Sequence, residues 1–228
     1  MKSKTLRNVG LALALVGVPA TAATVVARTL SGTTRSNVVS IKQSASYQDG
    51  ELLRRAWDLP VSRRYGRIEP QENRSSCGPS SLANLERSFG IASSETEILR
   101  GTGLCWLGFC VGGLTLDELS ELARQSTHHS VKVLRDLDYE HFRADLERAN
   151  DPRVRLVVNF HRAPLFGEGH GHFSPIGGFL ADRNLVFVLD VNAEYRPFLV
   201  DARRLFEAMN TVDSSSGKKR GLLLLEGT

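Results

Sequence analysis

Residues 171–191 read GHFSPIGGFLADRNLVFVLDV, and this stretch decides the fold class. It holds two short apolar runs, 173–180 and 185–191, which are rich in β-branched and aromatic residues and are separated by the polar residues ADRN. Such runs predict two antiparallel strands joined by a turn. Similar runs at 154–160 and 222–225 predict further strands.

The predicted hairpin has to bring two polar residues, His172 and Asp190, into register. Facing residues in an antiparallel hairpin have a constant index sum, and residues on one face share its parity. A two-residue turn at Asp182 and Arg183 would place His172 and Asp190 on opposite faces. The two side chains share a face if the loop has an odd length, if one strand carries a bulge, or if His172 precedes the paired residues. Gly177 and Gly178 offer a site for such a bulge.

The chain before this region has the spacing of helices. Leu82, Leu85 and Phe89 lie on one face of a helix that Ser75 or Ser76 can cap. Thr115 and Glu118 form a capping box at the start of another helix over 115–124, and shorter helices are predicted at 51–57, 96–99, 139–149 and 202–209. Helices followed by antiparallel strands indicate an α+β fold.

The composition excludes several classes of protein. The chain has 228 residues, with 41% hydrophobic, 7% aromatic and 24% charged side chains. This is ordinary globular usage, unlike that of a disordered, collagen-like or polytopic membrane protein. Lys2, Lys4 and Arg7 account for three of the four net positive charges. The remainder is close to neutral, so we expect no nucleic-acid partner.

The first residues have the pattern of an export signal. The three basic residues precede the apolar stretch 11–19 (LALALVGVP) and a small-residue cleavage site at 20–22 (ATA). The alternative is an uncleaved inner-membrane anchor, because residues 9–26 carry no charge and approach the minimum spanning length. Both interpretations predict a periplasmic or secreted folded part, with membrane contact only through this segment.

We therefore divide the chain into three parts. Residues 1–22 are the signal peptide or anchor, and the polar, Ser/Thr-rich residues 23–49 are expected to be a linker or loosely attached arm. Residues 50–228 are expected to form one catalytic domain, since a chain of this length can bury a sizeable core.

Cys77 is the strongest candidate for chemistry. A lone cysteine is usually an inert buried residue, but Cys77 is predicted in the first turn of a helix. There the helix dipole and free N–H groups stabilise a thiolate. Gln71 lies six residues upstream, and its amide together with the Cys77 backbone N–H could form an oxyanion hole.

His172 and Asp190 complete a catalytic set. Asp190 ends an apolar strand, where an unpaired carboxylate would be costly to bury. His172 is the natural partner: Asp190 would orient the imidazole, which would deprotonate Cys77. Each residue also has a structural alternative, a hydrogen-bonded core histidine for His172 and a turn carboxylate for Asp190.

The remaining histidines and cysteines allow other sites. His161 and His170 lie close to His172, but no further ligand has a recognised zinc spacing, so we expect no metal site. Cys105 and Cys110 predict a local disulfide in an oxidising compartment, with two free buried thiols or a soft-metal thiolate pair as alternatives. His128, His129 and His141 are expected at the surface.

The candidate residues occur in an order that resembles the phytochelatin synthases, and most closely their short bacterial and cyanobacterial members. The resemblance is carried by residues 49–53, by 71–78, by 171–179 with 189–191, and by 209–214 with 219–221. It implies a papain-like cysteine proteinase fold, in which an N-terminal helical part with the nucleophile helix packs on a C-terminal antiparallel sheet.

The resemblance also implies an activity. Cys77 would cleave the Cys–Gly bond of glutathione through a γ-glutamylcysteinyl thioester, giving γ-glutamylcysteine and glycine, with some transfer to a second glutathione. The same family implies a γ-glutamyl pocket of Asn159, Asp213 and Arg220. Without the family, Arg220 would be one residue of a solvated basic run.

There are three departures from the family pattern, one of which is the export signal, since the plant enzymes are cytosolic. Ser76 stands where an aromatic residue is expected before the nucleophile. The Cys-rich domain of the plant enzymes does not follow within these residues, so hydrolysis is expected to exceed polymerisation.

The sequence also gives expectations about cofactors, partners and alternative functions. No cofactor is expected to be required, although cadmium or zinc could act as activators or as thiolate complexes of glutathione. A homodimer is left open. The rival functions are a papain-like cysteine peptidase of other specificity and a non-enzymatic periplasmic protein that binds thiols or metals.

Overall fold

The computed structural model describes residues 34–35, 37–103, 105, 110 and 112–227. The expected signal peptide or anchor lies outside these residues. Among the residues described, no helix is both long enough and apolar enough to cross a membrane.

The described residues form a six-stranded antiparallel sheet with the order β2-β8-β3-β5-β6-β7. Its strands are β2 (Ser130–Arg135), β8 (Gly221–Glu226), β3 (Val154–His161), β5 (Gly171–Leu180), β6 (Leu185–Val188) and β7 (Phe198–Asp201). Two short strands, β1 (Thr34–Arg35) and β4 (Glu168–Gly169), pair separately. The strands predicted from the apolar runs are confirmed, and β2, β7 and the short strands β1 and β4 are additions to them.

The helices lie mainly in the first part of the chain. They are α2 (Gly50–Trp57), α3 (Pro60–Tyr65), α4 (Cys77–Ser88), α5 (Glu95–Leu99), α6 (Leu116–Ser126), α7 (Tyr139–Arg148), α8 (Ala163–Phe166) and α9 (Ala202–Met209), with 3-10 turns at Ile41–Gln43 and Ala181–Arg183. The capping box of Thr115 and Glu118 is confirmed at the start of α6. Helices followed by an antiparallel sheet confirm the α+β class.

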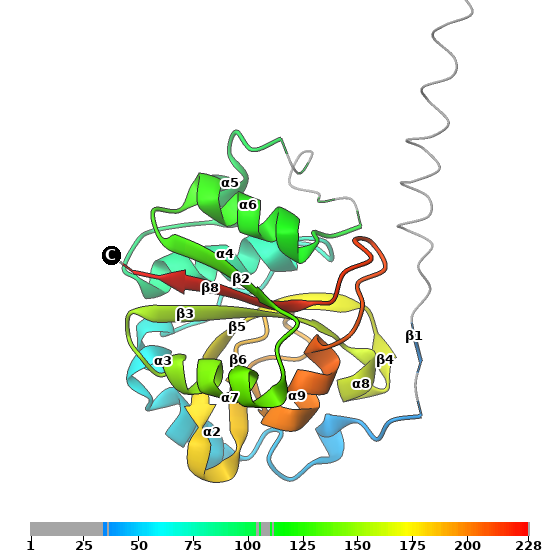
Figure 1. Ribbon diagram of the computed structural model, residues 1–228. Coiled ribbons are helices and arrows are strands. Elements are labelled where there is room, and N and C mark those ends of the chain that lie inside the picture. Colours follow the sequence, from blue (N-terminus) through cyan, green and yellow to red (C-terminus); the bar gives the residue numbers. More distant parts are fainter. Residues whose placement is uncertain (1–33, 36, 104, 106–109, 111, 228) are drawn as a thin grey trace, which may run out of the picture. The chain divides into compact units, whose positions relative to one another are not determined.

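Helices cover both faces of the sheet (Figure 1). On one face α4 and α6 pack on Val157, Leu223 and Leu225. On the other face α7 and α9 pack on Leu222 and Leu224. Because alternate side chains of β8 enter opposite cores, the strand has the unbroken apolar sequence LLLL rather than an alternating one. This packing fixes α4, which begins at Cys77, against the centre of the sheet.

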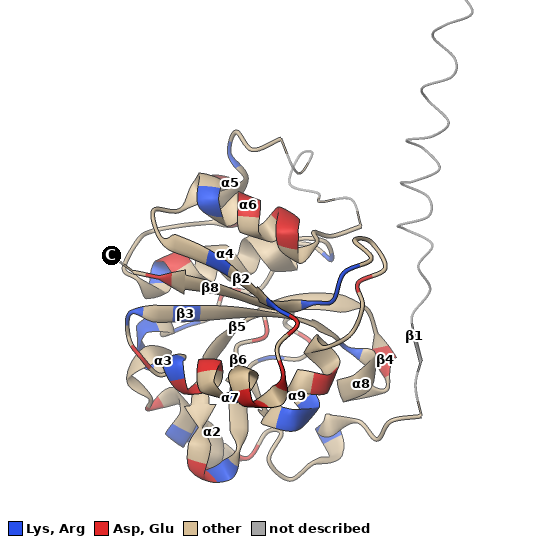
Figure 2. Cartoon of the chain, in the orientation of Figure 1, with Lys and Arg blue, Asp and Glu red and all other residues tan. Residues whose placement is uncertain are grey.

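Charged residues lie on the outer surfaces of the helices, with both signs interspersed over α7 (Figure 2). Arg148 of α7 pairs with Asp145 at 3.1 Å and with Glu226 of β8 at 2.8 Å. Arg143 lies 3.7 Å from Glu147 on the same helix. Short pairs of this kind neutralise the basic residues locally.

The packed domain begins earlier than the boundary expected at Gly50. Ile41 and Tyr47 are 2% and 7% exposed and belong to the same core as α7 and α9. The ring of Tyr47 stacks on Phe198 at a centroid distance of 5.3 Å. Few apolar residues occur in this polar stretch, and these two are buried, so at least residues 41–49 are part of the domain rather than a loose arm.

The hairpin of β5 and β6 contains the predicted bulge. Leu180 faces Leu185 and Gly178 faces Phe187, but Ile176 faces Val188, so the register shifts by one residue at Gly177. Beyond the bulge the facing residues have an even index sum, as His172 and Asp190 do. The bulge therefore brings these two side chains to the same face of the sheet.

A methyl group at Gly177 is expected to disturb the bulge. A Cβ at this position would lie 2.8 Å from Phe187 Cδ1 and 2.9 Å from Leu189 Cγ, both in buried side chains. We expect Gly177→Ala to lower the free energy of unfolding by about 1–3 kcal/mol, the usual cost of overpacking a core. Urea denaturation followed by circular dichroism measures this change.

Gly50→Ala is the matched control for this substitution. Gly50 is exposed at the start of α2, and the nearest atom to an added Cβ is Arg54 Nη1 at 4.0 Å. We expect no destabilisation there, because alanine fits a helix. Equal free energies of unfolding for the two variants would contradict the packing described at the bulge.

Candidate active site

Cys77 is the first residue of α4, and its side chain is buried at the sheet. The following residue, Gly78, allows α4 to pack closely, because a Cβ there would lie 3.0 Å from Leu119 of α6 and 3.7 Å from Phe173 of β5. Ser76 occupies the N-cap position but makes no side-chain cap bond; its hydroxyl donates to the Asn73 carbonyl instead. The first amides of α4 therefore receive no hydrogen bond from the Ser76 side chain.

His172 lies between the Cys77 thiol and a buried carboxylate. Its Nε2 is 3.0 Å from Asp190 Oδ1, and the two side chains are 6% and 0% exposed. The thiol of Cys77 is hydrogen-bonded to the His172 side chain. Since Nε2 faces Asp190, Nδ1 is the nitrogen left for the thiol. The structure thus joins Cys77, His172 and Asp190 in one hydrogen-bonded series.

The electrostatics of this series favour a thiolate and an imidazolium. Burial opposes ionisation of Cys77, but the charge of His172, its hydrogen bond and the Phe173 amide together lower the pKa of the thiol. Burial and Arg162 oppose protonation of His172, yet Asp190 and Cys77 raise the pKa of the imidazole. Against its own burial, the neighbouring His172 and Arg162 charges lower the pKa of Asp190.

Gln71 lies beside the end of the strand that carries Asp190. Its backbone amide donates to the Val191 carbonyl at 2.8 Å. One hydrogen of its side-chain amide is used, because Nε2 donates to the Asn73 carbonyl at 2.7 Å. An amide nitrogen carries two hydrogens, so one remains as a donor.

Asn159 and Arg220 border the strand of His172. Asn159 faces Phe173 in the β3–β5 register, and its buried Oδ1 has no hydrogen-bond partner among the described residues. Arg220 is 6% exposed, and its Nη2 would lie 3.0 Å from a Cβ at Gly171. Arg220 is thus buried beside the catalytic strand, unlike a residue of a solvated basic run.

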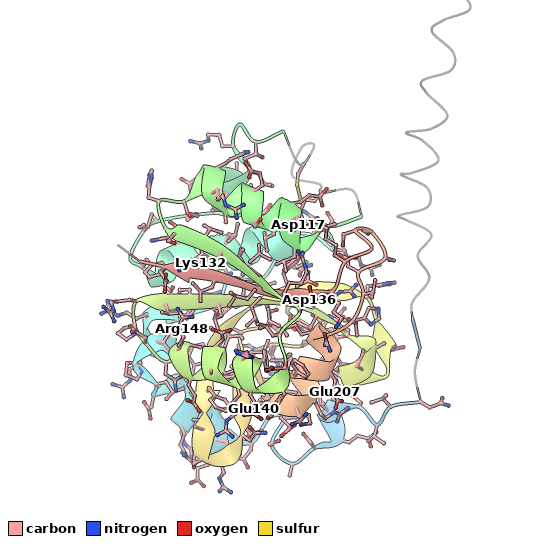
Figure 3. The ribbon with its side chains drawn as sticks, in the orientation of Figure 1. Asp117, Lys132, Asp136, Glu140, Arg148 and Glu207 are labelled. Carbon is pink, nitrogen blue, oxygen red and sulfur yellow. A yellow bond between two sulfur atoms is a disulfide. The ribbon has the colours of Figure 1, made fainter. Side chains whose placement is uncertain are left out.

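The segment that carries Arg220 is tied to its surroundings. Arg220 Nη2 lies 3.8 Å from Asp213 Oδ1, while Nη1 donates to the Val212 carbonyl. Arg220 Nε is buried without a hydrogen-bond partner among the described residues. Asp117 at the start of α6, labelled in Figure 3, accepts from Lys218 at 2.8 Å. These contacts hold the segment next to β5.

The other candidates lie as follows. Cys105 and Cys110 form a disulfide, which leaves Cys77 as the free cysteine of the chain. His161 Nδ1 accepts from the Ala163 amide at 3.2 Å. Within the described residues, no three His, Cys, Asp or Glu side chains are grouped as metal ligands.

Arg162 is the site residue that sequence reasoning missed. Its Nη2 lies 3.0 Å from Oδ1 and 2.9 Å from Oδ2 of Asp190. The signal was present, because a carboxylate at the end of an apolar strand needs cationic or donor partners. The sequence pattern indicates only His172 as that partner. Arg162 is harder to recognise, because it follows the end of the neighbouring apolar strand β3.

Sequence comparisons identify relatives of this chain. It is 35% identical over 127 residues to glutathione gamma-glutamylcysteinyltransferase 3 of Lotus japonicus, an alignment with 50% of this chain and 25% of that protein. It is also 35% identical over 117 residues to glutathione gamma-glutamylcysteinyltransferase of Schizosaccharomyces pombe, covering 50% and 28% of the two chains. The matches thus span about a quarter of the length of these curated relatives.

A solved structure shares the fold. A C39-like peptidase from Bacillus anthracis superimposes with a TM-score of 0.52 and 12% sequence identity, covering 71% of this chain and 94% of that chain. This similarity confirms the expected papain-like fold. At this identity it shows the fold alone.

A protein-family model also matches part of the chain. The model of phytochelatin synthase matches residues 109–222, which is half of the chain. The match includes His172, Asp190 and Arg220, while Cys77 lies before it. On this match and these relatives, the chain belongs to the phytochelatin synthase family.

Proposed function

We propose that this protein cleaves the Cys–Gly bond of glutathione and passes the γ-glutamylcysteinyl group to water or to a second glutathione. The observation that carries the proposal is the buried series of Cys77, His172 and Asp190, with the thiol at the start of a helix. A nucleophile, a base and an orienting carboxylate are the groups that acyl transfer requires. The names of the curated relatives support glutathione as the substrate.

The first half of the reaction forms a thioester. The Cys77 thiolate attacks the carbonyl carbon of the Cys–Gly bond, and the carbonyl π electrons move to oxygen. The Cys77 backbone N–H and the remaining hydrogen of the Gln71 amide can donate to that oxyanion. The intermediate collapses, the C–N bond breaks, and the imidazolium of His172 gives its proton to the departing glycine nitrogen.

The second half regenerates the enzyme. Neutral His172 takes a proton from water as the oxygen attacks the thioester carbonyl, and the C–S bond breaks to return the thiolate. The product is γ-glutamylcysteine. If the amine of a second glutathione attacks in place of water, the same steps yield a phytochelatin with two γ-glutamylcysteine units.

Asp213 and Arg220 have the charges that the γ-glutamyl group requires. The group ends in an α-ammonium and an α-carboxylate, which complement the Asp213 carboxylate and the Arg220 guanidinium. Nε of Arg220 and Oδ1 of Asn159 have no hydrogen-bond partner within the described part of the chain, and they are a donor and an acceptor that a polar substrate would satisfy. We place the γ-glutamyl pocket here, beside Gly171.

The remaining expectations enter as parts of the proposal. The reaction as written requires no resident metal, and cadmium or zinc would act through the thiolate of glutathione. The N-terminal residues favour a location outside the cytoplasm.

Cys77→Ser is expected to lower glycine release from glutathione by about 10³-fold or more, because a hydroxyl beside His172 is a far weaker nucleophile than a thiolate. Chromatography of glycine and of the thiol products measures the rate and separates hydrolysis from transfer. The double variant Cys105→Ser and Cys110→Ser is the control, since neither sulfur joins the series. Wild-type turnover by a folded Cys77→Ser protein would end the nucleophile assignment.

The pH dependence of Cys77 reactivity follows from the two shifted groups. Because its pKa is lowered, Cys77 remains a thiolate at pH values below the ordinary pKa of a thiol. Because its pKa is raised, His172 remains an imidazolium at pH values above the ordinary pKa of histidine. The ion pair is lost only below the first pKa and above the second. We expect alkylation of Cys77 by iodoacetamide to be fast at neutral pH and His172→Ala to move its onset to higher pH. Coinciding profiles would rule out the ion pair.

Arg220→Gln is expected to raise KM for glutathione and lower kcat/KM by about 10- to 100-fold, the usual loss for a charge-assisted contact. Cys77 alkylation should stay unchanged, because Arg220 does not contact the thiol series. Lys219→Gln is the matched control: this neighbouring side chain is 41% exposed. Steady-state kinetics on glutathione test both variants, and equal KM values for the two would remove Arg220 from the pocket.

A further inference from the structure

Arg162 lies where three strands of the site region meet. It follows β3 directly, and its backbone amide donates to the His170 carbonyl at 2.9 Å. Gly169 of β4 packs on its stem, because a Cβ there would lie 2.7 Å from Arg162 Cβ. The Arg162 side chain is 6% exposed. The stem of this long, flexible side chain is thus confined by the backbone at Gly169.

The guanidinium of Arg162 completes the hydrogen bonding of Asp190. Asp190 Oδ1 receives His172 Nε2 at 3.0 Å and the Asn192 amide at 2.8 Å. Arg162 Nη2 lies within 3.0 Å of both carboxylate oxygens, so it also reaches Oδ2. Without this contact, Oδ2 would have no hydrogen-bond donor among the described residues, and the carboxylate could rotate about its bond to Cβ.

An aromatic ring lies against the guanidinium of Arg162. The Arg162 Cζ lies 3.7 Å from the ring centroid of Tyr195. Phe166 packs against Tyr195 edge-on at 4.6 Å, and Lys42 Nζ lies 4.6 Å from its centroid. The Tyr195 carbonyl accepts from the hydroxyl of Tyr47 at 3.3 Å. The ring that carries Arg162 is therefore itself held by the segment before Gly50.

We propose that Arg162, held over the ring of Tyr195, is a positioning residue that fixes the Asp190 carboxylate and, through it, the imidazole of His172. The inference deepens the proposed function, on which it rests for the purpose of the aligned series. Arg162 acts on the reacting thiol through Asp190 and His172. A guanidinium does not lose its proton in a protein, so Asp190 keeps a charged partner at every working pH.

The charges around the series give the inference a distinctive readout. Arg162 lowers the pKa of Cys77 and opposes the protonation of His172. Tyr47 and Tyr195 also face Asp190, but burial raises the pKa of both, that of Tyr47 to about 12, so both stay neutral. The other charged groups near Tyr195 are Lys42, Glu168, Glu194 and Arg196. Removal of the Arg162 charge should therefore move the ionisation of both Cys77 and His172 to higher pH.

The test is the pH profile of iodoacetamide alkylation, which reports Cys77 because the other two cysteines are paired. We expect Arg162→Met to move the profile to higher pH by about one unit or more, as loss of a nearby charge does. Glycine release at neutral pH should fall by up to about 100-fold, the cost of a misplaced catalytic group. Arg162→Lys, which keeps the charge, should restore most of the alkylation profile.

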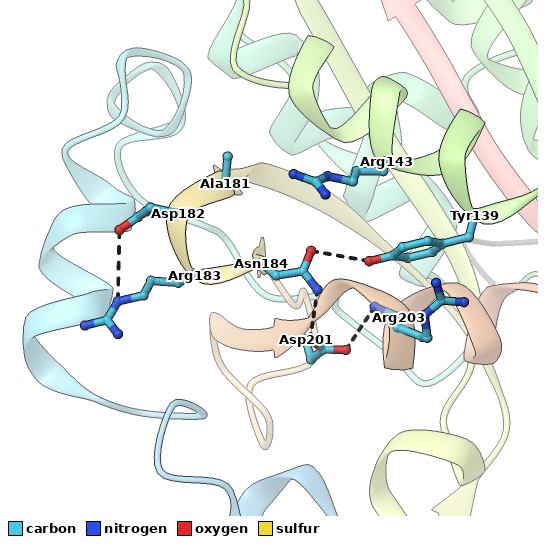
Figure 4. Close-up of a pocket in the computed structure, with 8 residues that line it drawn as sticks. All are labelled: Tyr139, Arg143, Ala181, Asp182, Arg183, Asn184, Asp201 and Arg203. Carbon is cyan, nitrogen blue, oxygen red and sulfur yellow. Dashed lines mark hydrogen bonds and ion pairs between the residues drawn. The ribbon is translucent and has the colours of Figure 1, made fainter.

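Arg203→Met is the matched control. Arg203 also lies 3.7 Å above a tyrosine ring, that of Tyr139. It lines a separate pocket of about 710 Å³ that contains none of the Cys77, His172 and Asp190 series (Figure 4). Loss of this second arginine should leave the alkylation profile of Cys77 in place.

Two outcomes would overturn the inference. One is a folded Arg162→Met protein, by circular dichroism, whose alkylation profile matches the wild type. If Arg162→Met does not fold, Tyr195→Leu decides, because it keeps the guanidinium but removes the ring beneath it: a shifted profile supports the inference, and an unshifted one overturns it. Alkylation needs no glutathione, so a wild-type protein that releases no glycine would refute the proposed function and leave this test intact.

Discussion

The carboxylate of Asp190 is the group on which the rest of the site depends. Its side chain is fully buried, and an uncompensated buried charge costs about 3–5 kcal/mol when a partner is removed. The fold meets this cost with His172, Arg162 and the Asn192 amide. His172 lies on β5, Arg162 follows β3, and Asn192 follows β6. The need to pair one buried charge therefore fixes these three parts of the chain relative to one another.

The bulge at Gly177 is the backbone feature that makes this arrangement attainable. A regular hairpin with the same turn would send His172 and Asp190 to opposite faces. A single extra residue changes the parity of the register, and it occurs where a side chain would collide with Phe187 and Leu189. The alignment of His172 with Asp190 at one end of the hairpin therefore depends on the side-chain packing around Gly177 in its middle. The nucleophile is positioned separately, because α4 packs against Leu119 of α6 and against Phe173.

Much of this could be predicted from the sequence, because strong local patterns produced it. The apolar runs predicted four strands and the capping box of Thr115 and Glu118 predicted the start of α6. Index parity limited the hairpin to three alternatives, of which the structure has the bulge. Features that depend on few residues could not be predicted in the same way. Strand β2 is an edge strand with partly exposed side chains, and Ile41 and Tyr47 are isolated buried residues in a polar stretch.

Charged residues were the hardest to place, because exposure is decided by distant partners. Arg162 and Arg220 are both buried, although neither stands in an apolar run. His129, expected at the surface, has a side chain that is 7% exposed and lies 3.1 Å from Glu86. Its ring packs on Phe89 at 4.2 Å. Burial of His129 follows from its contacts with the end of α4, which the sequence around His129 does not encode.

The disulfide of Cys105 and Cys110 has a consequence for the oxidation chemistry of the remaining thiol. A reactive thiolate that is oxidised is usually rescued by a resolving cysteine nearby. Here the other two sulfurs are already bonded to one another. An oxidised Cys77 must therefore be reduced by a thiol from solution, through a mixed disulfide. The redox state of the small thiols around the protein would then set the fraction of molecules that carry a free nucleophile.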